Sequence, residues 1–303
     1  MMPVHRVCPA WRVKRAAVSK NRRGTGKHLW SDGVRTIHVF KAGSGGGTTI
    51  AVRRIRLADL ASALRSGLGD LDAGFSHYIF AVLICPVTGI CLFALAARMN
   101  AWHLIYPILA GFALIGPFAA LGLYEFSRRR ERGLETTPRQ IAGVLRSPAL
   151  PAIAALGVWL LLLFLAWLYL ALTLYGRLFP QQAFADPASF LWAVFTTRQG
   201  WSLLLFGNLA GLGFALIVLG TTVVSFPLLL DRDAGVTTAV LVSALALIKN
   251  PLPVLAWGAI VAALLLIGAL PALAGLVVVL PVLGHSTWHL YRCLVQVDEA
   301  GQR

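Results

Sequence analysis

The sequence predicts an all-α, polytopic membrane protein with six transmembrane helices. Apolar residues make up 58% of the chain and charged residues 13%, and the mean hydropathy is +0.75. Soluble proteins have about 45–50% apolar and about 25% charged residues. A helix needs about 20 apolar residues to cross a hydrocarbon core of about 30 Å. Runs of about this length are expected to span the membrane at 78–97, 104–124, 152–175, 202–230, 254–270 and 273–291.

The basic residues are distributed as in a membrane protein rather than a nucleic-acid-binding protein. The net charge is +15, but six spans place 24 of the 27 Lys and Arg residues on one side of the membrane. Cytoplasmic loops carry this kind of excess. Both termini are therefore expected in the cytoplasm. The expected partners are the lipid bilayer and its anionic lipids, which basic cytoplasmic segments attract; no nucleic acid is expected.

Residues 1–50 are expected to form a basic, disordered tail before the membrane domain. They contain a glycine run at 43–47 and no apolar stretch of the kind that a secretory signal peptide has. The alternative is that this stretch is not native coding sequence and that the protein starts near Val52. The membrane domain is expected at 51–296 and a short cytoplasmic tail at 297–303.

Amphipathic segments are expected to lie at the membrane interface beside the spans. Leu57, Leu60 and Leu64 recur at helical spacing, which predicts an interfacial helix before the first span. Asp186 followed by Pro187 is typical of a helix start and predicts a short helix at 188–197. A further interfacial helix is expected at 238–248. The long, glycine-rich fourth span is expected to tilt or to kink near Pro227.

The chain is expected to contain three repeated units, each an interfacial helix followed by a transmembrane hairpin. The interfacial helices end in the similar sequences SALRSG, GVLRSP and ALIKNP. The returning spans carry Pro117, Pro227 and Pro281 about two turns before their ends. Weak internal similarity of this kind is common in membrane folds.

The three returning spans end in GPFAALGLYEFSRRRERG, SFPLLLDRD and PVLGHSTWHLYR. In sequence, order and spacing, these endings resemble an uncharacterised family of bacterial integral membrane proteins, the domain of unknown function family 2189. The resemblance covers about 52–295. It implies a six-helix protein of the bacterial inner membrane, and it implies no activity.

Ionisable residues at the cytoplasmic ends of the spans are the candidate functional residues. Glu125 and Asp231 follow spans two and four, and Asp233 lies close by. A carboxylate at a helix C-terminus is disfavoured by the helix dipole and should have a cation nearby. Two interpretations remain open, an ion-pair anchor and a proton or ion relay. The predicted polar cluster consists of Glu125, Arg128, Asp231, Arg232, His285 and His289.

His285 and His289 are four residues apart and should share one helix face. This spacing suits a haem or divalent metal, but a metal site needs further ligands, and no HExxH motif accompanies the pair. An interfacial donor role near Trp288 and Tyr291 is the simpler interpretation. No cofactor is therefore predicted, with haem or a divalent metal at His285 and His289 as the alternative.

No sequence motif of a known enzyme class is present. The sequence therefore predicts a non-enzymatic membrane protein with a transport, channel or scaffold role and a polar cluster on the cytoplasmic side. The alternative function is that of a metal- or haem-binding membrane protein.

Overall fold

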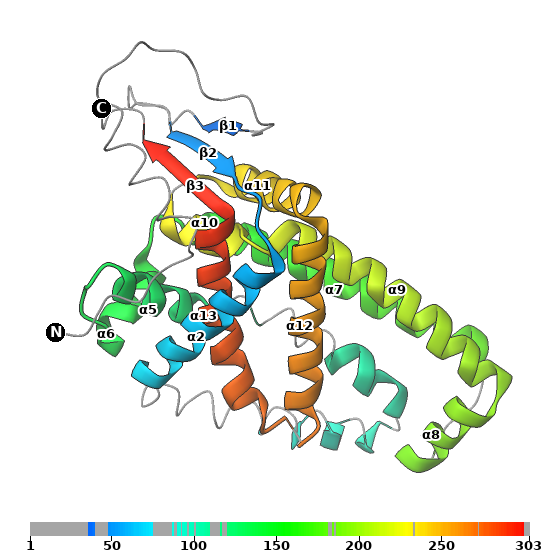
Figure 1. Cartoon of the computed structure of the whole chain (residues 1–303). Coiled ribbons are helices and arrows are strands. Elements are labelled where there is room, and N and C mark those ends of the chain that lie inside the picture. The colour runs from blue at the N-terminus through cyan, green and yellow to red at the C-terminus, as the bar shows by residue number, and fades with distance from the viewer. Residues whose placement is uncertain are drawn as a thin grey trace, which may run out of the picture.

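The computed structural model describes residues 36–39, 48–74, 87, 90–91, 93–95, 97–99, 101–109, 116, 120–180, 184, 186–232, 234–271 and 273–299. Most of them are helical (Figure 1). Much of the expected span 78–97 and part of the expected span 104–124 lie outside this set, as do Pro117 and Asp233.

Helix α13 (Leu276–Leu294) forms the centre of the described fold. Thirteen of its 19 residues are buried, and helix α2 (Leu57–Gly74) crosses it closely (Figure 1). At the crossing, Gly67 lies so close to Ser286 that a Cβ atom would collide with it. Glycine is therefore required at this position for the two helices to meet at this distance.

Helix α12 (Pro251–Ala269) runs antiparallel to α13 and joins it through a short connection. The hydrophobic core lies at the end of these helices that faces the strands, where α5 (Leu121–Glu131) and α10 (Ser225–Asp231) also pack. Its most buried large side chains include Phe226, Leu228, Trp288 and Tyr291.

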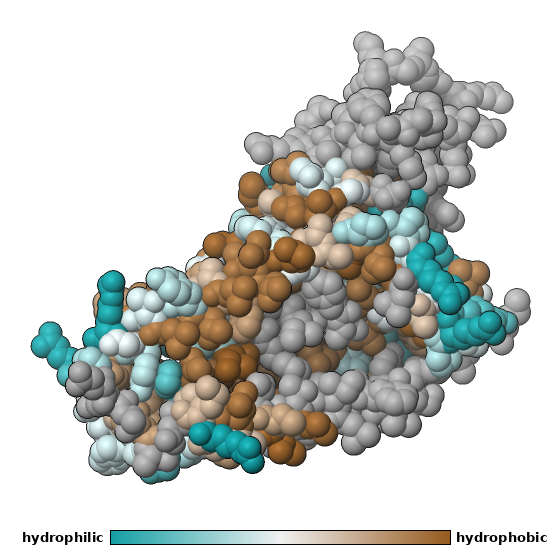
Figure 2. Space-filling model, turned by 180° about the vertical axis from the view of Figure 1, so that it is seen from behind, coloured by the Kyte–Doolittle hydropathy of each residue, from teal (hydrophilic) through white to brown (hydrophobic). Residues whose placement is uncertain are grey.

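Three segments of the described residues are long and apolar enough to cross a membrane: α7 (Leu150–Leu178), α12, and α9 (Arg198–Thr222) together with α10. Helices α7 and α9 pack side by side (Figure 1). Both expose large apolar side chains such as Trp159, Leu162 and Leu205. Seen from behind, apolar surface extends in a band across the molecule between polar ends (Figure 2). Such a surface is suited to contact lipid.

The fourth expected span is interrupted before Pro227. Helix α9 ends at Thr222, Val223 and Val224 form a turn, and α10 begins at Ser225. A proline ring collides with the helical carbonyl group four residues earlier, which here belongs to Val223. The kink expected near Pro227 therefore takes the form of a break one turn before it.

Two shorter apolar helices occupy the positions expected for interfacial helices. Helix α8 (Pro187–Thr196) starts at Asp186, whose Oδ1 accepts a hydrogen bond from the Ser189 backbone N–H at 2.8 Å. This is the N-cap that the sequence predicted. Helix α11 (Val236–Lys249) lies between α10 and α12. The short turn α6 (Pro138–Ile141) and the 3-10 helices η2 (Trp102–Leu104) and η3 (Ala142–Arg146) complete the helical segments.

The expectation of an all-α chain is corrected by a three-stranded antiparallel sheet. Strands β1 (Thr36–Val39), β2 (Thr48–Val52) and β3 (Val295–Glu299) pair in that order. The expected tails at 1–50 and 297–303 therefore each contain strand residues. The β-branched residues of TTIAV favour a strand, but its partner β3 lies at the other end of the chain, so no local pattern indicates the pairing.

Candidate functional site

Residues three and four apart lie on the same face of a helix. The polar side chains of α5 fall on two such faces. One face carries Ser127 and Arg130 toward α2 and α13, and the other carries Glu125, Arg128 and Arg129 toward α10 and η3. The basic and acidic side chains of α5 therefore belong to two distinct clusters.

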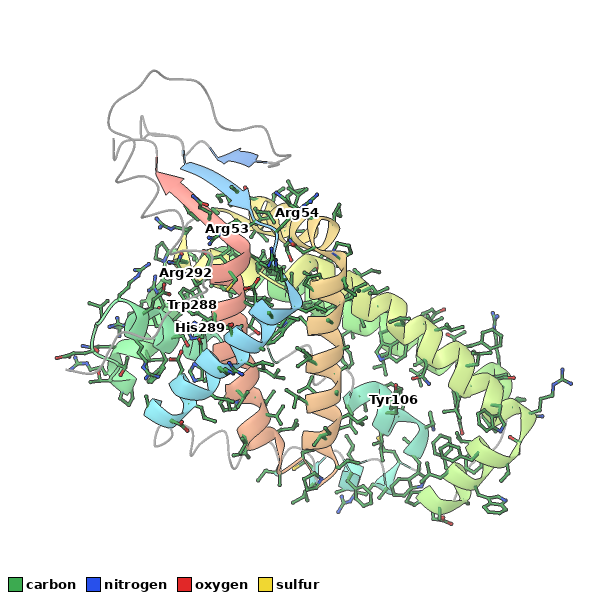
Figure 3. The ribbon with its side chains drawn as sticks, viewed as in Figure 1. Arg53, Arg54, Tyr106, Trp288, His289 and Arg292 are labelled. Atoms are coloured by element: carbon green, nitrogen blue, oxygen red, sulfur yellow. The ribbon has the colours of Figure 1, made fainter. Side chains whose placement is uncertain are left out.

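The first cluster is centred on Asp70 of α2, and we call it the Asp70 cluster. The Ser127 hydroxyl lies 2.5 Å from Asp70 Oδ2, and His289 Nε2 lies 2.9 Å from the same oxygen. Arg130 donates to Asp70 Oδ1 at 2.8 Å. On the far side of Ser127, its Oγ lies 2.7 Å from His285 Nδ1. Four polar groups from three helices thus form the continuous chain His289–Asp70–Ser127–His285. His289 lies where α2 crosses α13 (Figure 3).

The Asp70 cluster is shielded from solvent. Asp70, Ser127, His285 and His289 are all buried, His285 completely. Burial acts to raise the pKa of Asp70, but the hydrogen bond and positive charge of His289 and the hydrogen bond from Ser127 outweigh it and hold the pKa below its ordinary value of 3.8. The buried carboxylate is therefore stabilised in its charged form by its partners.

His285 and His289 share one face of α13, as their spacing predicted, but their ring nitrogens contact different partners. His289 Nε2 is at hydrogen-bond distance from Asp70. His285 contacts Ser127 and also hydrogen-bonds with the backbone of Leu123. Within the described part of the chain, no group of three or more His, Cys, Asp or Glu residues is arranged to hold a metal ion.

The second cluster contains Glu125 and Asp231, the two carboxylates that were predicted from the sequence to belong to a polar cluster. Glu125 pairs with Arg128 and with Arg129, at 2.6 Å and 2.8 Å, which lie three and four residues further along the same helix. Asp231 lies 2.7 Å from Arg132 and 3.6 Å from Arg232.

Asp231 is also tied to the C-terminal end of α13. It accepts a hydrogen bond from the Tyr291 hydroxyl at 2.9 Å and lies 3.8 Å from Arg292. Arg292 and Trp288, both labelled on α13 in Figure 3, in turn donate to the two carboxylate oxygens of Glu131 on α5. The second cluster therefore joins α5, α10 and α13 by charge.

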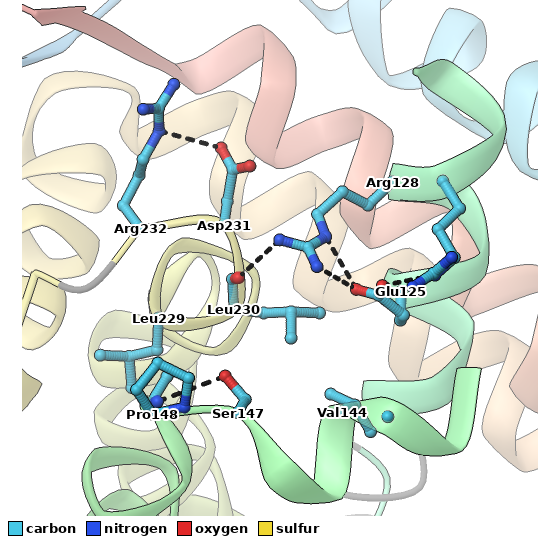
Figure 4. Close-up of a pocket in the computed structure, with 12 residues that line it drawn as sticks. Glu125, Arg128, Val144, Ser147, Pro148, Leu229, Leu230, Asp231 and Arg232 are labelled. Carbon is cyan, nitrogen blue, oxygen red and sulfur yellow. Dashed lines mark hydrogen bonds and ion pairs between the residues drawn. The ribbon is translucent and has the colours of Figure 1, made fainter. Parts of the chain in front are cut away.

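A pocket of about 360 Å³ opens beside the second cluster (Figure 4). Arg128 spans its upper wall, where it binds Glu125 and donates to the Leu230 carbonyl oxygen at 3.1 Å. We call this the α5–α10 pocket. It is lined by Glu125, Arg128, Arg129, Gly143, Val144, Ser147, Pro148, Ala149, Leu229, Leu230, Asp231 and Arg232.

The six predicted residues thus fall into two places. Glu125, Arg128, Asp231 and Arg232 line the α5–α10 pocket, whereas His285 and His289 belong to the Asp70 cluster. Both clusters lie along α5, but no direct contact joins the histidines to Glu125 or Asp231 among the interactions described above.

Asp70, Ser127 and Arg130 are not among the residues predicted from the sequence. A signal for Asp70 is present in the helical pattern of α2. Leu60, Ala63, Gly67 and Asp70 recur at spacings of three and four residues, and all four are buried. A carboxylate on the buried face of an amphipathic helix requires a partner, and this indicates a polar contact with another helix.

Comparison with known proteins yields a family match. The model of a family described as "Predicted integral membrane protein (DUF2189)" matches residues 105–231. No curated protein and no solved structure matches the chain. The matched residues include the first span ending quoted above and the second as far as Asp231, whereas the third, around His285, lies outside the match. Over residues 105–231, the chain therefore resembles the integral membrane proteins of the domain of unknown function family 2189, as its span endings predicted.

Proposed function

We propose that the protein is a non-enzymatic, six-span protein of the bacterial inner membrane that conducts protons through the Asp70 cluster as part of a transport role. The observation that carries this proposal is the buried hydrogen-bonded chain His289–Asp70–Ser127–His285. Ionisable residues within membrane proteins are costly to bury, and chains of Asp, Glu and His mark proton pathways in pumps and transporters.

The hydrogen count of the cluster supports a role in proton transfer. The Ser127 hydroxyl has one hydrogen, but its Oγ lies within hydrogen-bond distance of both Asp70 Oδ2 and His285 Nδ1. An ionised carboxylate and an unprotonated ring nitrogen are both acceptors only, so one further hydrogen must come from His285 or from Asp70. A proton can therefore shift between these two residues through Ser127 without any movement of heavy atoms.

His289 extends the chain at the other side of Asp70. Its Nε2 faces Asp70, whereas its buried Nδ1 has no hydrogen-bond partner in the described structure. A neutral imidazole has one donor and one acceptor nitrogen, so it can take up a proton at one nitrogen and release it at the other. His289 is therefore suited to exchange protons with Asp70.

The depth of the cluster is consistent with a path that opens to the cytoplasm. Asp70 lies on the helix expected in the headgroup region, Ser127 follows the expected end of span 104–124, and His285 lies within the expected span 273–291. Arg130 pairs with Asp70 and is partly exposed, and this places a fixed positive charge at the entrance. A fixed positive charge beside a carboxylate favours its ionised form.

Proton flux into proteoliposomes tests the proposal. Liposomes that contain a trapped pH-sensitive dye are given a potassium-diffusion potential, and the rate of the internal pH change is measured. Asp70→Asn preserves the size of the side chain but removes the carboxylate, and we expect it to lower the flux by about 100-fold, since a positioned proton-transfer group contributes about 10²–10⁴-fold.

Asp72→Asn is the matched control, because Asp72 lies on the same helix and is exposed. Its flux should equal that of the unaltered protein. The proposal fails if the unaltered protein conducts no faster than empty liposomes, or if Asp70→Asn and Asp72→Asn conduct equally well.

A further inference from the structure

We infer that the α5–α10 pocket binds the phosphate group of an anionic phospholipid at the cytoplasmic face of the membrane. The pocket lies outside the Asp70 cluster and shares none of its residues. The inference therefore does not depend on proton conduction, and each can fail alone.

The walls of the pocket place it at the depth of lipid headgroups. Candidate span 150–178 begins directly after Ala149, and candidate span 198–231 ends at Asp231, and both of these residues line the pocket. One span therefore starts and another ends at this level. Helices that cross a bilayer leave its hydrocarbon core at their ends, where the polar headgroups lie.

The lining of the pocket carries more positive than negative charge. Arg128, Arg129 and Arg232 face two carboxylates, those of Glu125 and Asp231. The charge of Asp231 is further compensated from outside the pocket by Arg132 and Arg292, both within 4 Å. The excess positive charge is suited to a bound monoanion, and a phosphodiester carries one negative charge.

Arg129 and Arg232 are the lining residues that we assign to the anion. Arg129 donates from Nε to Glu125 and from Nη1 to the Glu135 carbonyl oxygen. These two hydrogen bonds involve two of the five N–H donors of a guanidinium group. About a third of the Arg232 side chain is exposed. Guanidinium groups bind phosphate oxygens through paired hydrogen bonds, which makes arginine the preferred residue for this purpose.

The remaining walls suit the apolar part of a lipid. The apolar part of the lining consists mainly of Val144, Pro148, Leu229 and Leu230 (Figure 4). A volume of about 360 Å³ lies at the lower end of the range for small-molecule sites, about 300–1,000 Å³. One headgroup with its glycerol can occupy this space, while the acyl chains lie along the exposed apolar surface of α7.

Retention of lipid in native mass spectrometry tests the charge requirement. The purified protein is titrated with dioleoylphosphatidylglycerol or with dioleoylphosphatidylcholine, and the dissociation constant is measured for each. We expect tighter binding of the anionic lipid, and Arg232→Gln should weaken it by about tenfold, the effect of one lost charge-assisted hydrogen bond. Asp231 keeps its contacts with Arg132 and Tyr291 in this variant, so the fold should persist.

Arg146→Gln is the matched charge control. Arg146 lies in η3, is exposed and does not line the pocket. The Arg146→Gln variant should bind phosphatidylglycerol as tightly as the unaltered protein does. Equal weakening by Arg146→Gln and Arg232→Gln would show that only the overall basic charge matters and would overturn the inference. Equal binding of the two lipids by the unaltered protein would also overturn it.

A second pair of variants tests the pocket without changing any charge. Gly143 lines the pocket, and a Cβ atom built there has no neighbour within 4 Å. Gly143→Leu should fill the space and weaken phosphatidylglycerol binding by about tenfold, whereas Gly143→Ala should have little effect. Identical binding by Gly143→Leu and the unaltered protein would contradict a site in the pocket.

Competition identifies the source of the phosphate group. Inorganic phosphate is added at millimolar concentration during the titration with phosphatidylglycerol. A lipid site should retain phosphatidylglycerol, because the apolar walls contribute to its binding but not to that of free phosphate. Complete displacement by inorganic phosphate would assign the pocket to a soluble anion and would overturn the lipid assignment.

Discussion

At the scale of single residues, Asp70 determines how the polar cluster is arranged. It joins Ser127, Arg130 and His289 with one carboxylate. A buried carboxylate without partners would lose several kcal/mol of solvation, so removal of its partners is expected to cost more than removal of a surface charge. The pH dependence of stability provides a direct check.

The pKa of Asp70 is lowered in the folded protein, so its ionised form stabilises the fold. This stabilisation is fully present above the ordinary pKa of 3.8 and is lost as the pH falls through the lower pKa of the folded state. We expect the free energy of unfolding of the unaltered protein to decrease over this acidic range more steeply than that of Asp70→Asn. Denaturant unfolding in detergent at a series of acidic pH values measures the difference, and parallel curves would contradict it.

Gly67 is the second residue with a specific requirement. Gly67→Ala would place a methyl group against Ser286 at the crossing of α2 and α13, and overpacking of this kind typically costs about 1–3 kcal/mol. Gly69→Ala on the same helix meets no neighbour within 4 Å. It should stabilise the helix by about 0.5–1 kcal/mol, because alanine is the better helix former. Thermal unfolding of both variants should shift the midpoint in opposite directions, and a stable Gly67→Ala protein would disprove the close crossing.

At the scale of elements, a buried asparagine joins the sheet to the helices. Asn250, between α11 and α12, accepts a hydrogen bond from the Ile55 backbone N–H at 2.8 Å and donates to the Arg53 carbonyl oxygen at 2.9 Å. The backbone N–H of Arg53 donates to the Leu294 carbonyl oxygen. The segment between β2 and α2 is therefore held between the two ends of the last helical hairpin.

Asn250→Ala should destabilise the protein, because it leaves two backbone groups of this segment without their partner. The loss of a buried hydrogen-bond partner costs about 1–3 kcal/mol for each unsatisfied group. Asn208→Ala is a suitable control, since Asn208 is exposed on α9, where it accepts a hydrogen bond from Tyr106. Hydrogen exchange should increase in β2 and in the first turn of α2 for Asn250→Ala only; unchanged protection there would refute the role of Asn250.

The elements differ in how far the sequence predicts them. Helices α7 and α12, both candidate spans, and the capped helix α8 begin and end within a few residues of the expected positions, because apolar run length and capping chemistry are local. The break before Pro227 follows from the same local rule. The β2–β3 pairing joins residues near opposite ends of the chain, so no local pattern could predict it.

At the scale of the whole molecule, charge and apolar surface support one orientation in the membrane. The basic residues between α5 and α7 lie at one end of α7, and α8 follows its other end. The six-span topology proposed above requires the first end to face the cytoplasm and α8 to face the outside.

Cysteine accessibility in intact cells tests this orientation. In a cysteine-free background, Thr137→Cys between α5 and α6 should resist a membrane-impermeant maleimide, and Ala188→Cys in α8 should react with it. Both positions are exposed, and the proposed topology puts them on opposite sides of the membrane. After the cells are broken, Thr137→Cys should react as well. Labelling of Thr137→Cys in intact cells would reverse the proposed topology.

The sequence by itself determined the membrane class, the positions of most helices and the common face of His285 and His289, because composition, run length and helical spacing are properties of neighbouring residues. Only the tertiary structure decided that these histidines meet Asp70 and Ser127. The contacts join residues 57, 158 and 219 positions apart, and they depend on which faces of α2, α5 and α13 pack together. A local pattern reveals that a helix face is polar, but the partner of that face is chosen by the packing of the whole chain.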